Sequence, residues 1–308
     1  MLDIPQGVLP VLATPFDPSG DLDTAAMSDQ IDFVIEHGVH GVVLGMVSEV
    51  LRLSSEERDL LTQATCKAVN QRVSVIASVG AESLHTAVRH ARNAEVAGVS
   101  AVMAIPPMAT SCDDRELYEY YAGVIDSIDI PVVVQDASGY LGRPLSIELQ
   151  ARLYERFGDR ALFKPEAQPI GPRLSQLLTA TDGQAKVYEG TGGLALVDSY
   201  QRGLIGTMPG PDIPWALVAL WNALVAGDYE RVAEIQGPLS ALVSIQNSLD
   251  SFVAVQKHLL HRQGVIPQGD ARGPVGYRMD ADTRREVDRL FDRLADAVGV
   301  SSATGARN

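Results

Sequence analysis

The chain has 308 residues, of which 46% are hydrophobic and 21% are charged. This is the composition of a soluble globular protein that is large enough to bury a substantial core. The net charge of −14 and the isoelectric point of about 4.8 argue against nucleic acids and anionic membranes as partners. The two cysteines suggest no disulfide framework, and neither a signal peptide nor a membrane-spanning run is apparent, so we expect a cytoplasmic protein.

A unit made of a short apolar run, a loop and an amphipathic helix recurs about every 30 residues. The runs are continuous and rich in β-branched residues, which is typical of parallel strands covered by helices. Strands that alternate with helices in this way predict an α/β fold, a (β/α)8 TIM barrel. An open doubly wound sheet is the alternative, but no strand is followed by its common G-x-G-x-x-G turn. The predicted strands are 8–13, 41–44, 73–77, 101–105, 132–134, 161–163, 186–188 and 204–208.

Several of the predicted helices have recognisable start or stop signals. Small polar residues followed by acids favour a helix start, proline suits the first turn, and glycine suits the position after the last turn. The starts are Asp23 or Thr24, Ser54 with Glu56 and Glu57, Glu82-Ser83, Ser146 and Pro214, and Gly98 ends the third helix.

The strand pattern stops after about Gly227. Residues 228–263 and 280–298 are predicted to be helical, with a glycine- and proline-containing loop at 264–276 between them. We therefore expect a barrel over residues 1–226 and an α-helical extension packed on it over 227–308. Its tail from residue 301 is predicted to be disordered.

Lys164 is the lysine at which chemistry is expected. It ends the sixth apolar run, and Pro165 follows it directly. An amine at the end of a buried strand is costly to keep charged, so part of it is expected to be neutral and nucleophilic towards carbonyl carbon. The alternative is a lysine that only pairs with a carboxylate. The other lysines are interpreted as ordinary: Lys67 and Lys257 fall in helical patterns, and Lys186 opens a strand.

Further polar residues follow the predicted strands at the barrel end where catalytic groups are expected. Glu166 lies two positions past Lys164, so an extended chain would place both side chains on one side. There the carboxylate would stabilise the cation or carry protons, with a plain salt bridge as the alternative. Gln135, Asp136 and Tyr140 follow the fifth strand and complete the predicted catalytic set.

Glycine turns after other strands are candidates for substrate binding. The turn Gly45-Met46-Val47 exposes backbone amides that could hold a carboxylate. Glu189-Gly190 begins a glycine-rich turn that could line a pocket closely, and Thr207 in the eighth strand is assigned to the same role. No histidine joins a cluster with metal-ligand spacing, so no metal is expected.

An ordered set of motifs runs through most of the chain. Together these motifs resemble the dihydrodipicolinate synthase / N-acetylneuraminate lyase superfamily of class I (Schiff-base) lyases, over about residues 7–274. The resemblance implies that Lys164 is the Schiff-base lysine and that the backbone of Met46-Val47 binds the carboxylate of a 2-oxo acid. It also implies a homodimer or homotetramer without a cofactor. The motifs are Ala13-Thr14-Pro15-Phe16, Gly38-Val39-His40-Gly41, Glu49, Leu53-Ser54-Ser55-Glu56-Glu57-Arg58, Pro106-Pro107, Pro131-Val132, Phe163-Lys164 and Gly190.

The chain departs from the pattern of this superfamily at residues close to the expected site. The Gln135-Asp136 ending of the fifth strand looks more like branches that act on 2-oxo-3-deoxy sugar acids as aldolases or dehydratases. Met46 and Val47 replace two hydroxyl residues, Gln135 replaces a tyrosine, Asp136 replaces an asparagine, Tyr140 aligns near an arginine whose closest substitute is Arg143, and Pro107-Met108 replaces an aromatic pair.

The expected function is therefore a lyase that forms a Schiff base with pyruvate or another 2-oxo acid. Because the tyrosine is absent, Glu166 or Asp136 is expected to carry the proton, with help from Tyr140 or a water molecule. Three alternatives remain open: a catalytically silent protein that binds a 2-oxo acid, dihydrodipicolinate synthase proper, and another kind of barrel in which Lys164 is structural.

Overall fold

The computed structural model describes residues 4–140 and 144–300. Arg143 and the tail from residue 301 lie outside these ranges. Within them, parallel strands form a five-stranded sheet in the order β2-β3-β4-β5-β6 and a three-stranded sheet in the order β1-β8-β7. Parallel bridges from Val11 to Val43 and from Phe163 to Val187 join the two sheets into a ring. The strands are β1 (Gly7–Val8), β2 (Gly41–Leu44), β3 (Ser74–Ser78), β4 (Ala101–Ala104), β5 (Val132–Gln135), β6 (Ala161–Lys164), β7 (Tyr188–Glu189) and β8 (Gly206–Thr207).

The predicted (β/α)8 barrel is confirmed, although some strands are shorter than predicted. The first strand was expected over residues 8–13, but β1 ends at Val8. Pro10 has no backbone N–H and gives the ladder no donor. Its carbonyl still accepts from the Val43 amide of β2 at 2.9 Å, and an isolated bridge to Val43 follows at Val11.

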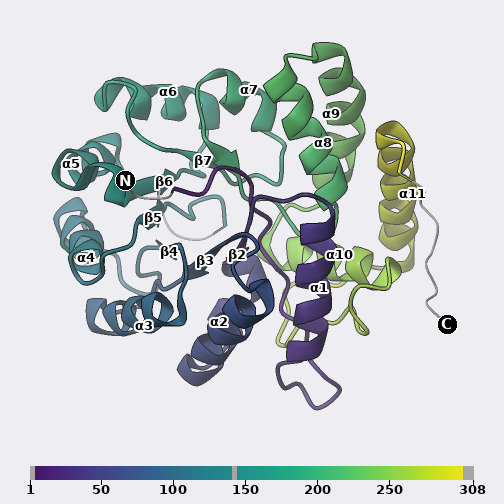
Figure 1. Cartoon of the computed structure of the whole chain (residues 1–308), viewed down its shortest axis with the longest axis horizontal. Coiled ribbons are helices and arrows are strands. Elements are labelled where there is room, and N and C mark those ends of the chain that lie inside the picture. The colour runs from purple at the N-terminus through teal and green to yellow at the C-terminus, as the bar shows by residue number, and fades with distance from the viewer. Residues whose placement is uncertain (1–3, 141–143, 301–308) are drawn as a thin grey trace.

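Helices surround the ring of strands (Figure 1). The predicted helix starts at Asp23, Ser54, Ser83 and Ser146 are confirmed, since each side chain accepts a hydrogen bond from the first turn. The helices around the ring are α1 (Thr24–Glu36), α2 (Ser55–Val69), α3 (Leu84–Ala97), α4 (Asp114–Asp126), α5 (Ile147–Phe157), α6 (Ile170–Ala180), α7 (Leu196–Gln201) and α8 (Pro214–Ala226), with short 3₁₀ turns η1 (Met46–Ser48), η2 (Val50–Arg52) and η3 (Gly158–Arg160).

Three further helices, α9 (Tyr229–Val243), α10 (Leu249–Arg262) and α11 (Ala281–Val298), follow the barrel. The prediction of one helix over 228–263 is wrong. Ser244 caps the end of α9, and Ser248 starts α10 with a capping box that includes Ser251. A break of this kind turns the chain back, so α10 can reach the barrel.

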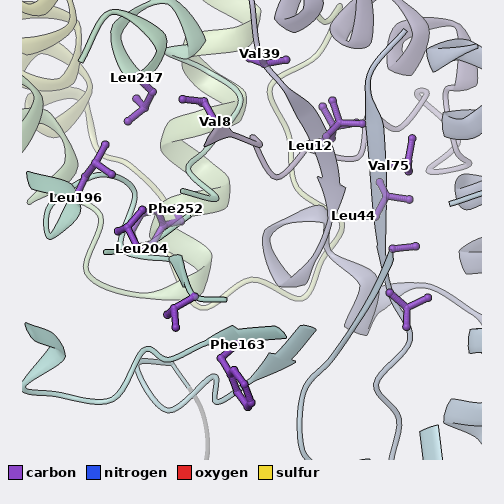
Figure 2. Packing of buried hydrophobic residues seen from close by; sticks show 14 of the residues in the cluster. Val8, Leu12, Val39, Leu44, Val75, Phe163, Leu196, Leu204, Leu217 and Phe252 are labelled. Carbon is purple, nitrogen blue, oxygen red and sulfur yellow. The ribbon is translucent and has the colours of Figure 1, made fainter. Parts of the chain in front are cut away.

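The C-terminal helices gather on one side of the barrel, where α9 and α11 pack on α8 (Figure 1). Figure 2 shows Phe252 of α10 and Leu217 of α8 among the buried side chains that also include Val8 and Leu44 of the strands. Because these residues belong to one apolar cluster, we propose that residues 227–300 are an extension packed on the barrel. In the described ranges, no helix is both long enough and apolar enough to cross a membrane.

A buried ion pair joins α10 to the loop after β2. Lys257 Nζ lies 2.5 Å from Glu49 Oε1, and both side chains are 0% exposed. The same ammonium lies 4.5 Å from the centre of the Phe16 ring. Burial lowers the pKa of Lys257, while the Glu49 carboxylate opposes this shift. The interpretation of Lys257 as an ordinary lysine is therefore wrong, because most of α10 is buried and this lysine faces the barrel.

Breaking this pair should destabilise the fold strongly. Lys257→Met is expected to lower the free energy of unfolding by about 3–5 kcal/mol, because Glu49 then keeps a buried charge without its nearest cationic partner. Arg52 Nη1, 3.5 Å from Glu49 Oε2, is the more distant cation that remains. Urea denaturation measures the change, and Lys67→Met on the exposed side of α2 is the control. In the double variant with Glu49→Gln, most of the loss should be recovered. If Lys257→Met alone lowered the free energy of unfolding by less than about 1 kcal/mol, the ion pair would not be what holds α10 in place.

Candidate active site

A pocket opens at the carboxyl ends of the barrel strands. It encloses about 400 Å³ of empty space, part of which is open to solvent. Strand ends and the loops after them supply most of its walls, and α10 supplies the rest. The lining includes Gly45, Met46 and Val47 after β2, Gln135 and Tyr140 from β5 and its loop, Lys164 and Glu166 from β6 and its loop, Gly190 after β7, Gly210 after β8, and Phe252 and Gln256 of α10.

Lys164 and Glu166 form a buried ion pair inside this pocket. Lys164 Nζ lies 2.5 Å from Glu166 Oε1, and each residue is 4% exposed. Gln135 is the register partner of Lys164 in the neighbouring strand, and its Nε2 donates to Glu166 Oε2 at 3.1 Å. The carboxylate of Glu166 therefore joins the ends of β5 and β6, and the predicted placement of both side chains on one side is confirmed.

Gly190 leaves the space that this pair occupies. A Cβ atom at this position would lie 2.6 Å from Lys164 Cε, 2.7 Å from its Nζ and 2.8 Å from Glu166 Oε1. A side chain at this position would force the ends of Lys164 and Glu166 to move, so glycine lets the backbone after β7 approach the amine while the ion pair keeps its place. Gly190 thus shapes the pocket instead of contributing a side chain to it.

The turn after β2 presents backbone amides to the same pocket. The Gly45 amide donates to Ser48 Oγ at 3.0 Å, which closes the turn, and η1 begins at Met46. The amides of Met46 and Val47 stand at the start of η1 and donate to no group in the described chain. Free amides at a helix start favour a negative charge, so this turn suits a carboxylate.

Tyr140 faces the pocket from the loop after β5. Its ring packs edge-on against Phe252, with centroids 5.7 Å apart and planes at 86°. Burial raises the pKa of Tyr140 well above its ordinary value, and Glu166 and Glu189 raise it further. The phenol therefore stays protonated near neutral pH, and its hydroxyl can donate a hydrogen bond.

Three other predicted site residues lie close by, but their side chains do not line the pocket. Asp136 Oδ1 accepts from the amide and the hydroxyl of Ser138, and its Oδ2 is buried without a partner in the described chain. Glu189 Oε2 accepts from the Thr207 hydroxyl at 2.5 Å, and Oε1 accepts from the amide of Thr191. The roles assigned to Asp136, Glu189 and Thr207 stay predictions. Across the described ranges, no group of three or more His, Cys, Asp or Glu side chains is arranged to hold a metal ion.

Residues of α10 and of the loop after β8 complete the pocket, and the sequence did not identify them. Gln256 is 2% exposed, and its Oε1 has no hydrogen-bond partner in the described chain. A Cβ at Gly210 would lie 2.4 Å from Gln256 Nε2 and 2.5 Å from Asp212 Oδ1. The sequence did contain one signal for Gln256. This polar residue has helical spacing with the apolar Phe252 and Leu259, so it falls on the buried stripe of the helix.

Asp212 next to this wall carries a buried carboxyl group. Burial raises its pKa from 3.8 to about 7. A carboxyl group with a raised folded-state pKa binds its proton more tightly in the folded chain than in the unfolded chain. Stability therefore falls as pH rises from about 4, and the loss is complete only above pH 7.

Asp212→Asn should consequently stabilise the protein in a pH-dependent way. We expect its advantage over the native chain in free energy of unfolding to grow by on the order of 2 kcal/mol between pH 5 and pH 8. Urea denaturation at both pH values measures the difference. The exposed Asp29 of α1, replaced in Asp29→Asn, should give no such trend. An advantage that is equal at both pH values would show that Asp212 titrates as an exposed carboxylate does.

Comparisons with known proteins agree with this arrangement. The sequence model of the dihydrodipicolinate synthetase family matches residues 4–293. L-2-keto-3-deoxyarabonate dehydratase of Azospirillum brasilense is 29% identical over 95% of this chain and 96% of its own length. 4-Hydroxy-tetrahydrodipicolinate synthase of Methanosphaerula palustris is 30% identical over 89% of this chain and 93% of its own length. The crystal structure of dihydrodipicolinate synthase from Rhodopseudomonas palustris, 25% identical, superimposes with a TM-score of 0.86 over 96% of this chain and 100% of that one. The resemblance predicted from the motifs is thus confirmed, and the chain belongs to the dihydrodipicolinate synthetase family.

Proposed function

We propose that this protein is a class I lyase that forms a Schiff base between Lys164 and pyruvate or a longer 2-oxo acid. The observation that carries the proposal is the buried pair of Lys164 and Glu166, 2.5 Å apart, inside a pocket at the barrel's catalytic end. Transfer of the ammonium proton to Glu166 across this contact would leave a neutral amine facing the pocket. A neutral amine is the form that attacks a carbonyl carbon.

The turn after β2 supports a 2-oxo acid as the substrate. Its carboxylate would accept hydrogen bonds from the amides of Met46 and Val47, which line the same pocket as Lys164. Anchored there, the acid would place its adjacent ketone carbon near the amine. Holding the two reacting atoms together in this way lowers the entropic part of the barrier.

The proposed reaction begins when Lys164 Nζ adds to C2 of the substrate. The ketone oxygen takes one proton from the attacking nitrogen and one back from Glu166 and leaves as water, so Glu166 is again a carboxylate. The resulting iminium withdraws electrons, so the proton on C3 can pass to Glu166 while its electron pair forms the enamine double bond between C2 and C3. In a dehydratase, the enamine then expels the hydroxyl on C4, which leaves as water with a proton from Glu166. In an aldolase, Glu166 instead takes the proton of the C4 hydroxyl as the bond between C3 and C4 breaks.

The relatives support a 2-oxo-3-deoxy sugar acid as the substrate. The dehydratase of Azospirillum brasilense acts, by its name, on L-2-keto-3-deoxyarabonate and matches nearly the whole chain. Tyr140 supports the same choice, because its protonated phenol could donate to a departing or distal hydroxyl. We propose dehydratase or aldolase activity on such an acid as the function of the pocket.

Mass spectrometry after borohydride reduction tests the Schiff base. The native protein incubated with pyruvate should gain one reduced adduct, and peptide mapping should place it on Lys164. Turnover of a panel of 2-oxo-3-deoxy acids would then distinguish water loss from carbon–carbon cleavage. Binding of pyruvate without turnover of any acid would identify a silent binding protein, and formation of 4-hydroxy-tetrahydrodipicolinate would identify the synthase.

A further inference from the structure

Ser48 is a buried serine for which the proposed chemistry has no use. It follows Met46 and Val47 in the turn after β2, but it is 0% exposed and its side chain does not line the pocket. Its Oγ accepts from the Gly45 amide at 3.0 Å and donates to the carbonyl of Leu12. One hydroxyl therefore closes the turn and ties it to the chain segment after β1.

A second buried hydroxyl holds the same residue. Thr14, which is also 0% exposed, donates from Oγ1 to the carbonyl of Ser48 at 2.5 Å. Leu12 and Thr14 both lie between β1 and α1, so one stretch of chain holds Ser48 through its side chain and through its backbone. Because these groups are buried, water does not readily replace a hydrogen bond that is lost there.

The backbone at the end of this turn is strained and needs contacts that hold it. Glu49, directly after Ser48, has a φ of 56°, the left-handed conformation that a residue with a side chain adopts at a cost. Conformations of this kind persist only where the surrounding structure holds them. The ion pair with Lys257 holds the Glu49 side chain, and the two bonds of the Ser48 hydroxyl hold the backbone before it.

The turn can offer a carboxylate only backbone donors. Neither Met46 nor Val47 has a side chain that can donate to a carboxylate, whereas their amides donate to no group in the described chain. The direction of an amide is set by the backbone that carries it, and no rotation of a side chain can correct it. How well the turn binds a carboxylate therefore depends on how firmly its backbone is held.

We propose that Ser48 is a positioning residue, which directs the amides of Met46 and Val47 towards the carboxylate of the 2-oxo acid. This inference rests on the proposed function, because it presumes that the acid binds at this turn with its ketone at Lys164. It adds that a hydroxyl outside the pocket sets how strongly the protein selects an acid over a neutral ketone. Displacements of about 0.5–1 Å in the groups that hold a substrate are enough to weaken such a site.

The test compares pyruvate with hydroxyacetone, which keeps the methyl ketone but carries a hydroxymethyl group in place of the carboxylate. Each ketone is incubated with the protein and cyanoborohydride, which reduces the iminium, and peptide mapping over time gives the second-order rate constant of adduct formation at Lys164. In Ser48→Ala, the rate constant for pyruvate should fall by about 5–20-fold, because the amides that hold the anion are no longer fixed. The rate constant for hydroxyacetone should stay within about twofold of the native value, since this ketone offers the amides no negative charge.

Ser48→Gly, which removes the same hydroxyl, should act in the same direction and serves if Ser48→Ala does not fold. Ser199→Ala, at a buried serine of α7 that does not line the pocket, should keep both native rate constants. A fall that is equal for the two ketones, or no fall for pyruvate, in the Ser48 variant would overturn the positioning role. Failure of the native protein to form an adduct with pyruvate at Lys164 would instead overturn the Schiff-base proposal, so the two failures are distinguishable.

Discussion

Lys164→Ala is expected to abolish the adduct that borohydride traps with pyruvate and to lower kcat by roughly 10⁴–10⁶. The reason is that this amine is placed in the pocket between Glu166 and the backbone of Gly190, where a ketone carbon can reach it. Removal of a covalent nucleophile leaves only binding and polarisation by the rest of the site. Intact mass after reduction measures the adduct, and single-substrate kinetics measures kcat.

Two further lysine variants show whether the loss is chemical. Lys164→Arg keeps a cation beside Glu166 but cannot act as the nucleophile, so it should retain the fold and lose the adduct. Lys67→Ala, on the exposed side of α2, should keep both the adduct and kcat. An adduct that persists in Lys164→Ala would place the nucleophile at another lysine and would contradict the assignment of Lys164.

The barrel could be predicted because its pattern is local and repeated. Each strand is a continuous apolar run, and caps such as Ser54 and Ser146 act within a single helical turn. Strand lengths were less predictable, since Pro10 interrupts a ladder that hydrophobicity alone would extend to residue 13. The break between α9 and α10 was missed because apolar residues such as Val243 and Ile245 continue into it, although Ser244 ends α9 and Ser248 starts α10.

The site could be predicted in part. Site residues that are close together in the sequence were predicted, and those that come from a distant segment were not. Lys164 and Glu166 are two residues apart, and an extended backbone is enough to place both side chains together. Gln256 reaches the same pocket from α10, and no local sequence pattern predicts where on the barrel α10 packs. Its docking depends on contacts such as the ion pair of Lys257 with Glu49, which join residues 208 positions apart by their numbering.

Two carboxylates, those of Glu166 and Asp136, were candidates for the proton carrier, and the structure places them differently. Glu166 contacts Lys164 and lines the pocket, and Gln135 holds its second oxygen. Asp136 was an equal candidate by sequence. Its side chain does not line the pocket, and Ser138 occupies one of its oxygens. We therefore propose that Glu166 moves the proton from the amine and then from C3.

Glu166→Gln should accordingly lower kcat by about 10²–10⁴, because an amide of the same shape cannot accept the proton. Reduced adduct with pyruvate should still form, although more slowly, since Lys164 remains in place. Asp136→Asn should change kcat by less than about tenfold. Comparison of kcat and of the rate of adduct formation in the two variants separates proton transfer from loss of the nucleophile. The reverse ranking, with Asp136→Asn the slower variant, would transfer the role to Asp136, and near-native kcat in both would require a carrier other than these carboxylates.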